Sequence, residues 1–247
     1  MERQAGTFGK FWGMVAAASA GTLVLASCTA WPTTEAATPA TGGDIAIDQA
    51  HALKGGISRG DAPGFPVTLS APGLYKLTSD LVVPSGATGI VITAPGVTLD
   101  LNGFAVRGPV ACRAEAAAVQ CNADAAHGQS GIHAAAGGVI VRHGSVRGFA
   151  GPGLKLAADA LVEDLELSGN AEYGLHANTS ASRAVRVRNV KAYGNGADGF
   201  WLQTGRIENS RAEGNGRAGF ALGALATVKD GSAAGNKGLE GNALPRS

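Results

Sequence analysis

The second half of the chain repeats a segment that ends in glycine and asparagine. Its four copies are residues 162–170, 187–195, 207–215 and 228–236, and each has Asp or Asn two residues after an initial Val or Ile. The closing asparagines lie 25, 20 and 21 residues apart. A unit of this length cannot bury its apolar residues alone, whereas stacked units can. The repeat therefore predicts a solenoid.

The apolar segments within each repeat are short and show no helical period. A further glycine follows each closing asparagine in three copies, and it precedes a strand-like segment at 175–177, 200–202 and 220–222. Eroded copies lie upstream, with Phe149 in the asparagine position and similar strands at 154–156, 132–134 and 90–92.

Coiling each unit into one turn places equivalent strands side by side and parallel, ~4.8 Å apart. The glycine before each marker asparagine permits a tight corner, and the aligned asparagines can form a hydrogen-bonded ladder. A leucine-rich repeat has a similar length, but the leucine framework and helix that it needs are missing. The predicted fold class is all-β, a right-handed parallel β-helix built as a single-stranded solenoid.

The composition agrees with a folded, glycine-rich solenoid. Glycine supplies 38 of 247 residues, and apolar residues make up 45% at a formal charge of +1, so the chain can bury a core. The glycines keep no three-residue period, which excludes collagen. A charge this close to zero argues against nucleic acid as a partner.

Residues 1–27 read as an export signal. Basic residues precede an apolar segment, 14–26, that is shorter than the ~20 residues of a membrane-spanning helix. Residues 25–28, Leu-Ala-Ser-Cys, resemble the lipobox of bacterial lipoproteins. The resemblance implies that Cys28 is lipidated and anchors the chain in a membrane. Because Thr29 follows in place of aspartate, it also implies an outer-membrane lipoprotein facing the periplasm or the surface. The alternative is an ordinary cleaved signal.

With Cys28 assigned to lipid, the other two cysteines have only each other. Cys112 and Cys121 are therefore predicted to form a disulfide, in a loop near residues 109–130 of an exported protein. A metal site would need more ligands than these two cysteines, and no Cys/His cluster follows. Residues 28–43, mostly Thr, Ala, Pro and Gly, are predicted to be a flexible tether.

Three further segments carry a family resemblance. Residues 61–68 (DAPGFPVT), 72–78 (PGLYKLT) and 97–104 (VTLDLNGF), together with the repeats, resemble an exported bacterial family with the pectin-lyase-like fold. The resemblance covers about residues 44–247. That superfamily holds lyases, hydrolases, epimerases, binding modules and tailspikes, so the resemblance implies a fold and not one activity.

The predicted domains follow from the repeat and the resemblance. Residues 44–66 are expected to form an N-terminal cap and residues 67–247 the β-helix. Residues 48–54 are expected to form a short helix that plugs the end of the stack, where open strand edges would invite pairing.

Stacking should align one outward column of side chains, two residues after each corner glycine. Its members are Val91, His133, Lys155, His176, Trp201 and Ala221, and two residues further on the same face carries Ala157, Asn178 and Gln203. An indole can stack on a sugar, carboxamides can bond to hydroxyls, and cations can pair with uronate carboxylates. Tyr173 and Asp198 are expected to edge this surface. The alternative is an ordinary solvated sheet face.

A second column should have a structural role. Arg142, Glu163, Arg188, Glu208 and Lys229 follow the Val or Ile position in successive turns, with alternating sign. Opposite charges on adjacent strands stabilise the register by ~0.2–1 kcal/mol per pair.

Catalytic motifs are mostly missing. No acidic cluster suggests a Ca²⁺-dependent lyase, so no metal or cofactor is predicted, although Ca²⁺ stays open. Glu172 and Asp198 do not form a recognisable hydrolase pair, and residues 173–178 match the Asp-Pro-His segment of alginate epimerases only loosely. The weak catalytic candidates are His176 as a base and Lys155 as the group that neutralises a carboxylate.

Three functions remain open. The preferred one is a lipid-anchored β-helix that binds or scaffolds cell-envelope polysaccharide, acidic polysaccharide included, through His133, Lys155, His176, Asn178, Trp201 and Gln203. The second is a polysaccharide lyase or uronate C5-epimerase. The third is a non-catalytic structural or protein-interaction solenoid.

Overall fold

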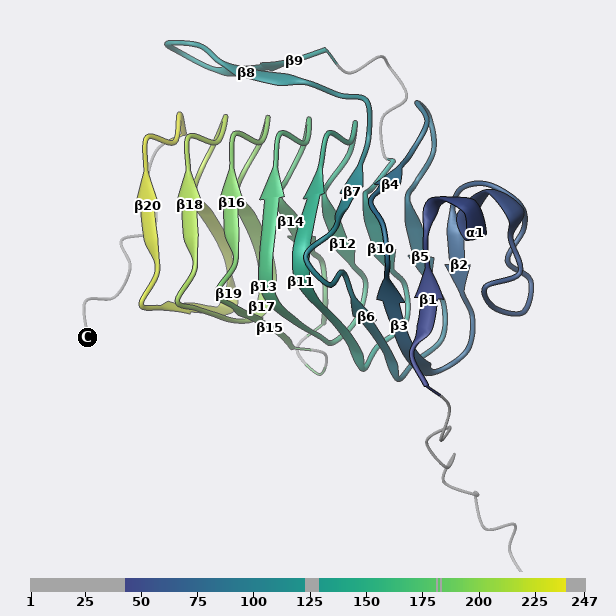
Figure 1. The fold of residues 1–247 in the computed structure, drawn as a ribbon. Helices are drawn as coiled ribbons and strands as arrows, with labels where there is room; N and C mark the ends of the chain where they lie inside the picture. The colour runs from purple at the N-terminus through teal and green to yellow at the C-terminus, as the bar shows by residue number, and fades with distance from the viewer. Residues whose placement is uncertain (1–42, 123–128, 181, 183, 239–247) are drawn as a thin grey trace, which may run out of the picture. The chain divides into compact units, whose positions relative to one another are not determined.

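Parallel strands coil into a β-solenoid of about seven turns (Figure 1). The computed structural model describes residues 43–122, 129–180, 182 and 184–238. Within them, 18 strands join by hydrogen bonds into the solenoid, and every pairing among these strands is parallel. The prediction of an all-β parallel solenoid is confirmed. The hand of the coil stays a prediction, and the predicted signal, Cys28 and tether lie outside the described residues.

Each turn passes through three faces in chain order. Face 1 contains β2 (Val67–Leu69), β5 (Ile90–Ile92), β10 (Ile132–Ala134), β12 (Leu154–Leu156), β14 (Leu175–Ala177) and the first parts of β17 (Phe200–Glu208) and β19 (Phe220–Lys229). Face 2 contains β1 (Ile45–Ile47), β3 (Gly73–Leu77), β6 (Val97–Asp100), the first parts of β11 (Val139–Arg147) and β13 (Ala160–Ser168), β15 (Val185–Arg188) and the second parts of β17 and β19. Face 3 contains β4 (Leu81–Val82), β7 (Ala105–Arg107), the second parts of β11 and β13, β16 (Lys191–Tyr193), β18 (Arg211–Glu213) and β20 (Ser232–Ala234).

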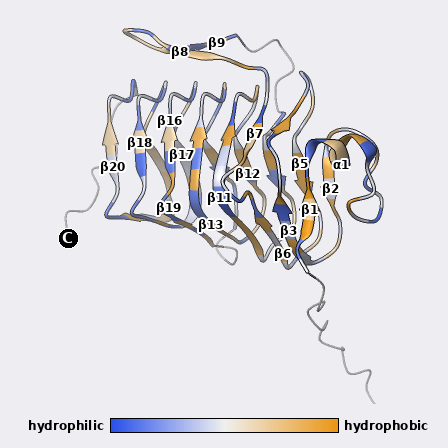
Figure 2. Ribbon diagram, in the orientation of Figure 1, coloured by the Kyte–Doolittle hydropathy of each residue, from blue (hydrophilic) through white to orange (hydrophobic). Residues whose placement is uncertain are grey.

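The core is built from aligned apolar residues that alternate with outward polar ones. On face 1 the inward residues Ile132, Leu154, Leu175 and Phe200 are fully buried in register. The rings of Phe200 and Phe220 stack with centroids 5.1 Å apart. Figure 2 shows hydrophobic residues along the strands of successive turns. Stacking therefore buries what one turn cannot bury alone.

The corner between faces 2 and 3 explains the Asp or Asn inside each repeat. The residues there have left-handed backbone, with φ between 47° and 58°: Asn102, His143, Asp164, Asn189, Asn209 and Asp230. Asn and Asp adopt this conformation more readily than other non-glycine residues. The repeated position is thus a corner requirement.

The corner between faces 3 and 1 uses the predicted glycines. Gly169, Gly194 and Gly214 have φ of 59°, 60° and 59°. The glycines that open the face 1 strands differ, because Gly174 and Gly199 have no positive φ. A Cβ on Gly199 would lie 2.8 Å from the carbonyl oxygen of Gly219 in the next turn. Close approach of successive turns, and not a corner conformation, requires these glycines.

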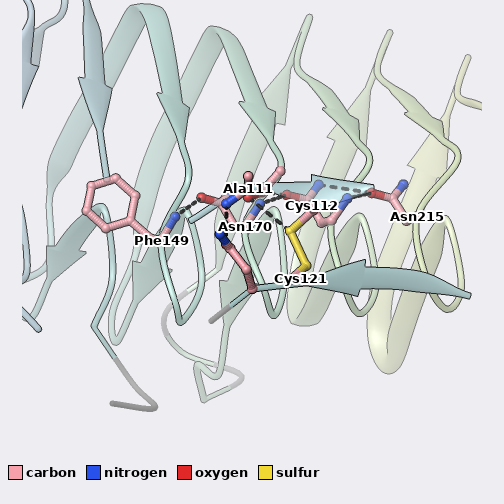
Figure 3. Close-up of a disulfide and its surroundings, with 9 residues drawn as sticks. Ala111, Cys112, Cys121, Phe149, Asn170 and Asn215 are labelled. Carbon is pink, nitrogen blue, oxygen red and sulfur yellow. Dashed lines mark hydrogen bonds between the residues drawn. A yellow bond between two sulfur atoms is a disulfide. The ribbon is translucent and has the colours of Figure 1, made fainter. Parts of the chain in front are cut away.

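The asparagine ladder is confirmed beside this corner (Figure 3). Asn170 Nδ2 donates to Asn195 Oδ1 at 3.0 Å, and Asn195 Nδ2 donates to Asn215 Oδ1 at 2.9 Å. Asn215 continues the row to Asn236 at 2.9 Å. Phe149 occupies the asparagine position one turn earlier, where its backbone N–H donates to Asn170 Oδ1 at 3.2 Å.

A helix closes the N-terminal end, as expected. Helix α1 (Gln49–Lys54) begins after Asp48, whose carboxylate accepts from the backbone N–H of His51 at 2.8 Å. Ala52 is fully buried in the solenoid core. Residues 45–47, inside the predicted cap, already form β1 and pair with β3.

A disulfide-bonded hairpin runs along the outside of the stack (Figure 1). Strands β8 (Cys112–Ala114) and β9 (Val119–Cys121) are antiparallel, and Cys112 and Cys121 are joined as predicted. We name residues 110–122 the strap. Val110 N–H donates to the Gly148 carbonyl at 2.9 Å, and Lys237 Nζ donates to the Ala116 carbonyl at 3.1 Å. The strap therefore contacts turns that are far apart along the stack.

Candidate functional site

The polar column predicted on face 1 is in register. His133, Lys155, His176 and Trp201 lie opposite one another on β10, β12, β14 and β17. All four are half-buried, and the residues that flank them on each strand point into the core. The repeat spacing thus brings together residues that are distant in sequence.

Three rings lie in a row on this column. The centroids of Tyr173 and His176 are 4.9 Å apart, and those of His176 and Trp201 are 4.7 Å apart. Tyr173 comes from the corner before β14, which confirms that it borders the column. Such a row gives a partly exposed aromatic surface with polar edges.

The charge on the column belongs to Lys155. Burial lowers the pKa of His133 and of His176 below the ordinary value of 6.5, and the positive charge of Lys155 lowers both further. At neutral pH both imidazoles are therefore uncharged. The histidines were expected to act as cations on this surface. As neutral imidazoles they can instead donate one hydrogen bond and accept another.

The carboxamides and acidic residues around the column are placed differently from one another. Asn178 and Gln203 are exposed, as a binding role requires. Asp198, which was expected to edge the surface, is only 3% exposed. Its carboxylate accepts from the backbone N–H of Ala218 at 2.8 Å and so joins consecutive turns. Glu172 is half-buried.

The alternating charges on face 2 are in register and extend further than the sequence suggested. The column continues toward the N-terminus through Asp100 and Lys76. Arg142 Nε lies 3.1 Å from Asp100 Oδ2, and Arg188 Nε lies 3.9 Å from Glu208 Oε2. Burial alone would raise the pKa of Asp100, but hydrogen bonds from the Asn102 backbone and from His143, and the charges of His143 and Arg142, lower it. This column supports the register.

A column on face 3 went unnoticed in the sequence. Arg107, Arg147, Ser168 and Tyr193 each directly precede a corner glycine, and they are aligned on β7, β11, β13 and β16. The same repeat alignment that gave the face 1 column contains this signal. The sequence does not show that the strap lies beside these residues.

The described part of the chain contains neither a metal-binding cluster nor a helix that could span a membrane. Within it, no group of three or more His, Cys, Asp or Glu side chains is arranged to hold a metal ion. Its one helix, α1, has 6 residues, far from the ~20 that cross a membrane.

Register, core and outward columns together define a parallel β-solenoid with a polar and aromatic face. Comparison of the chain with protein-family models, with curated proteins and with solved structures gave no match.

Proposed function

We propose that this chain is an exported, lipid-anchored protein that binds cell-envelope polysaccharide along face 1. The observation that carries the proposal is the ring row of Tyr173, His176 and Trp201 beside the cation of Lys155. Sugar rings stack on aromatic faces, and an ammonium group pairs with a uronate carboxylate. An acidic polysaccharide lying along the column fits both features.

The proposal also covers the type of β-helix and the cellular location of the chain. The right-handed coil of the pectin-lyase-like type is supported by the resemblance of residues 61–68, 72–78 and 97–104, together with the repeats, to that family. Lipid anchoring is supported by the lipobox-like segment ending at Cys28. The anchor would hold the solenoid close to the envelope polysaccharide.

Affinity electrophoresis through gels containing polygalacturonate, alginate or a neutral glucan tests the proposal. We expect an acidic polysaccharide to retard the protein, and Trp201→Ala to weaken the retardation tenfold or more, about 1.4 kcal/mol. The control is Val82→Ala, which removes a side chain that is 55% exposed on face 3.

The outcomes separate the three functions. Unchanged retardation of Trp201→Ala would show that face 1 is not the site. Release of unsaturated uronate that His176→Ala abolishes would move the assignment to a lyase, with neutral His176 as the base. No retardation in any gel would favour a structural solenoid.

A further inference from the structure

An open groove of about 430 Å³ lies between face 3 and the strap. The face 3 column of Arg107, Arg147, Ser168 and Tyr193 lines one side of it, and Cys112 and Ala114 of the strap line another part. The glycan-binding proposal gives none of these residues a role, because they lie on a different face from Trp201. The volume falls within the ~300–1,000 Å³ typical of small-molecule sites.

The groove concentrates positive charge. Arg107 and Arg147 are directly opposite each other on adjacent strands, an arrangement that destabilises a sheet unless an anion neutralises it. Asp80 Oδ2 lies 3.1 Å from Arg107 Nη2. Arg147 forms no ion pair with any carboxylate in the described residues. Asp80 therefore pairs with one of the two guanidinium groups, and the Arg147 guanidinium has no ion-pair partner among the described residues.

The other groups at the groove suit a hydroxylated ligand. The Tyr193 hydroxyl already donates to Glu166, which leaves the ring of Tyr193, 40% exposed, as a stacking surface. Burial and Glu166 raise the pKa of Tyr193, so its hydroxyl keeps its proton. Arg107 Nε is buried with no acceptor among the described residues, and an unsatisfied buried donor is costly unless a bound ion, ligand or water supplies the acceptor.

We propose that Arg107 and Arg147 bind the carboxylate of a small hydroxylated acid, of the size of a sugar acid, in this groove. A guanidinium group matches a carboxylate with two parallel hydrogen bonds. The bound carboxylate neutralises the second guanidinium, while the sugar ring lies against Tyr193.

The disulfide holds the wall of this site in place. A two-stranded hairpin alone is marginally stable, and the Cys112–Cys121 bond joins the two strands of the strap. A wall that is formed before the ligand arrives lowers the ordering cost of binding. Replacing both cysteines by alanine is therefore expected to weaken binding of the ligand several-fold.

Isothermal titration of the full chain with D-glucuronate tests the site. We expect saturable binding that glucose does not reproduce, a tenfold or larger loss in Arg147→Ala, and a several-fold loss in Arg107→Lys, which keeps the charge without the planar fork. The matched control is Arg211→Ala, which removes one exposed positive charge from face 3 outside the groove and should change the affinity less than twofold.

Each result decides for or against the groove. Displacement of glucuronate by inorganic sulfate supports the same two arginines as a general oxyanion site, and failure of sulfate to displace it supports a carboxylate site. No saturable heat with either anion, or unchanged affinity in Arg147→Ala, overturns the proposal. Loss in Trp201→Ala without loss in Arg147→Ala would place glucuronate on face 1 and also overturns it. Circular dichroism and thermal melting verify that each variant is folded.

Discussion

Lys155 sits between two imidazoles, and this arrangement sets the charge of face 1. His133 and His176 occupy the strands on either side of it, and both have a lowered pKa, first from burial and then from the Lys155 charge. Because the folded pKa values lie below the unfolded value of 6.5, the unfolded chain binds more protons in acid. Stability is therefore expected to fall as the pH drops from about 6.5 through the folded pKa values.

Replacing Lys155 with methionine should raise the pKa of both histidines while leaving part of the shift. The charge is removed, but burial still disfavours the protonated imidazoles. Histidine ring resonances followed by NMR during a pH titration measure both values. Arg142→Met on face 2 serves as the control and should leave both unchanged. Identical titration curves in Lys155→Met and wild type would refute the coupling.

At the scale of the element, the asparagine ladder joins turns through buried side chains. Asn195 accepts from the backbone and side chain of Asn170, and it donates to Asn215 and to the Leu167 carbonyl at 3.1 Å. Each central asparagine thus satisfies groups in two neighbouring turns. Removal of one leaves several buried donors and acceptors without partners.

Asn195→Ala is expected to lower the free energy of unfolding by about 3 kcal/mol or more, since each unsatisfied buried group costs roughly 1–3 kcal/mol. Asn236→Ala should cost less, because Asn236 is half-buried and lies at the end of the described ladder. Urea denaturation monitored by circular dichroism compares the two. Equal losses would mean that position within the ladder does not matter.

The sequence predicted these elements as far as the repeat extends. The recurring Gly-Asn pair aligns repeats that are 20 to 25 residues apart, so the face 1 column, the ladder and the corner glycines followed from that alignment. The burial of Asp198 did not follow, because it depends on how its carboxylate reaches Ala218 in the next turn. The groove did not follow either, because the strap has no counterpart in the repeat and reaches Lys237, 121 residues from Ala116.

At the scale of the whole molecule, a solenoid couples each turn to its immediate neighbours. The strap adds contacts between turns that are not neighbours. Val110, at the start of the strap, is hydrogen-bonded to Gly148, and Ala116, in its hairpin turn, is hydrogen-bonded to Lys237. Between these two contacts, Cys112 Sγ lies 3.2 Å from the Gly169 carbonyl oxygen. The later turns are therefore connected both through the stack and along its outside.

Cys112→Ala with Cys121→Ala should loosen the later turns selectively. Amide hydrogen exchange, read by mass spectrometry, is expected to become several-fold faster in β16, β18 and β20, because local opening there no longer breaks contacts with an ordered strap. Strands β2 and β5 provide the internal control, since the strap makes no hydrogen bond to them in the described residues. Uniform acceleration along the stack would contradict a local role.

The strap also decides how the molecule carries tension. When force pulls the two ends of the solenoid apart, successive turns separate one row of hydrogen bonds at a time. Between Gly148 and Lys237 a second path runs parallel to the axis and shares the load. The strap starts directly after β7, so the turns before β5 are the ones without such reinforcement among the described residues. Under force the solenoid should begin to unravel at that end, away from the turns that carry His176 and Trp201.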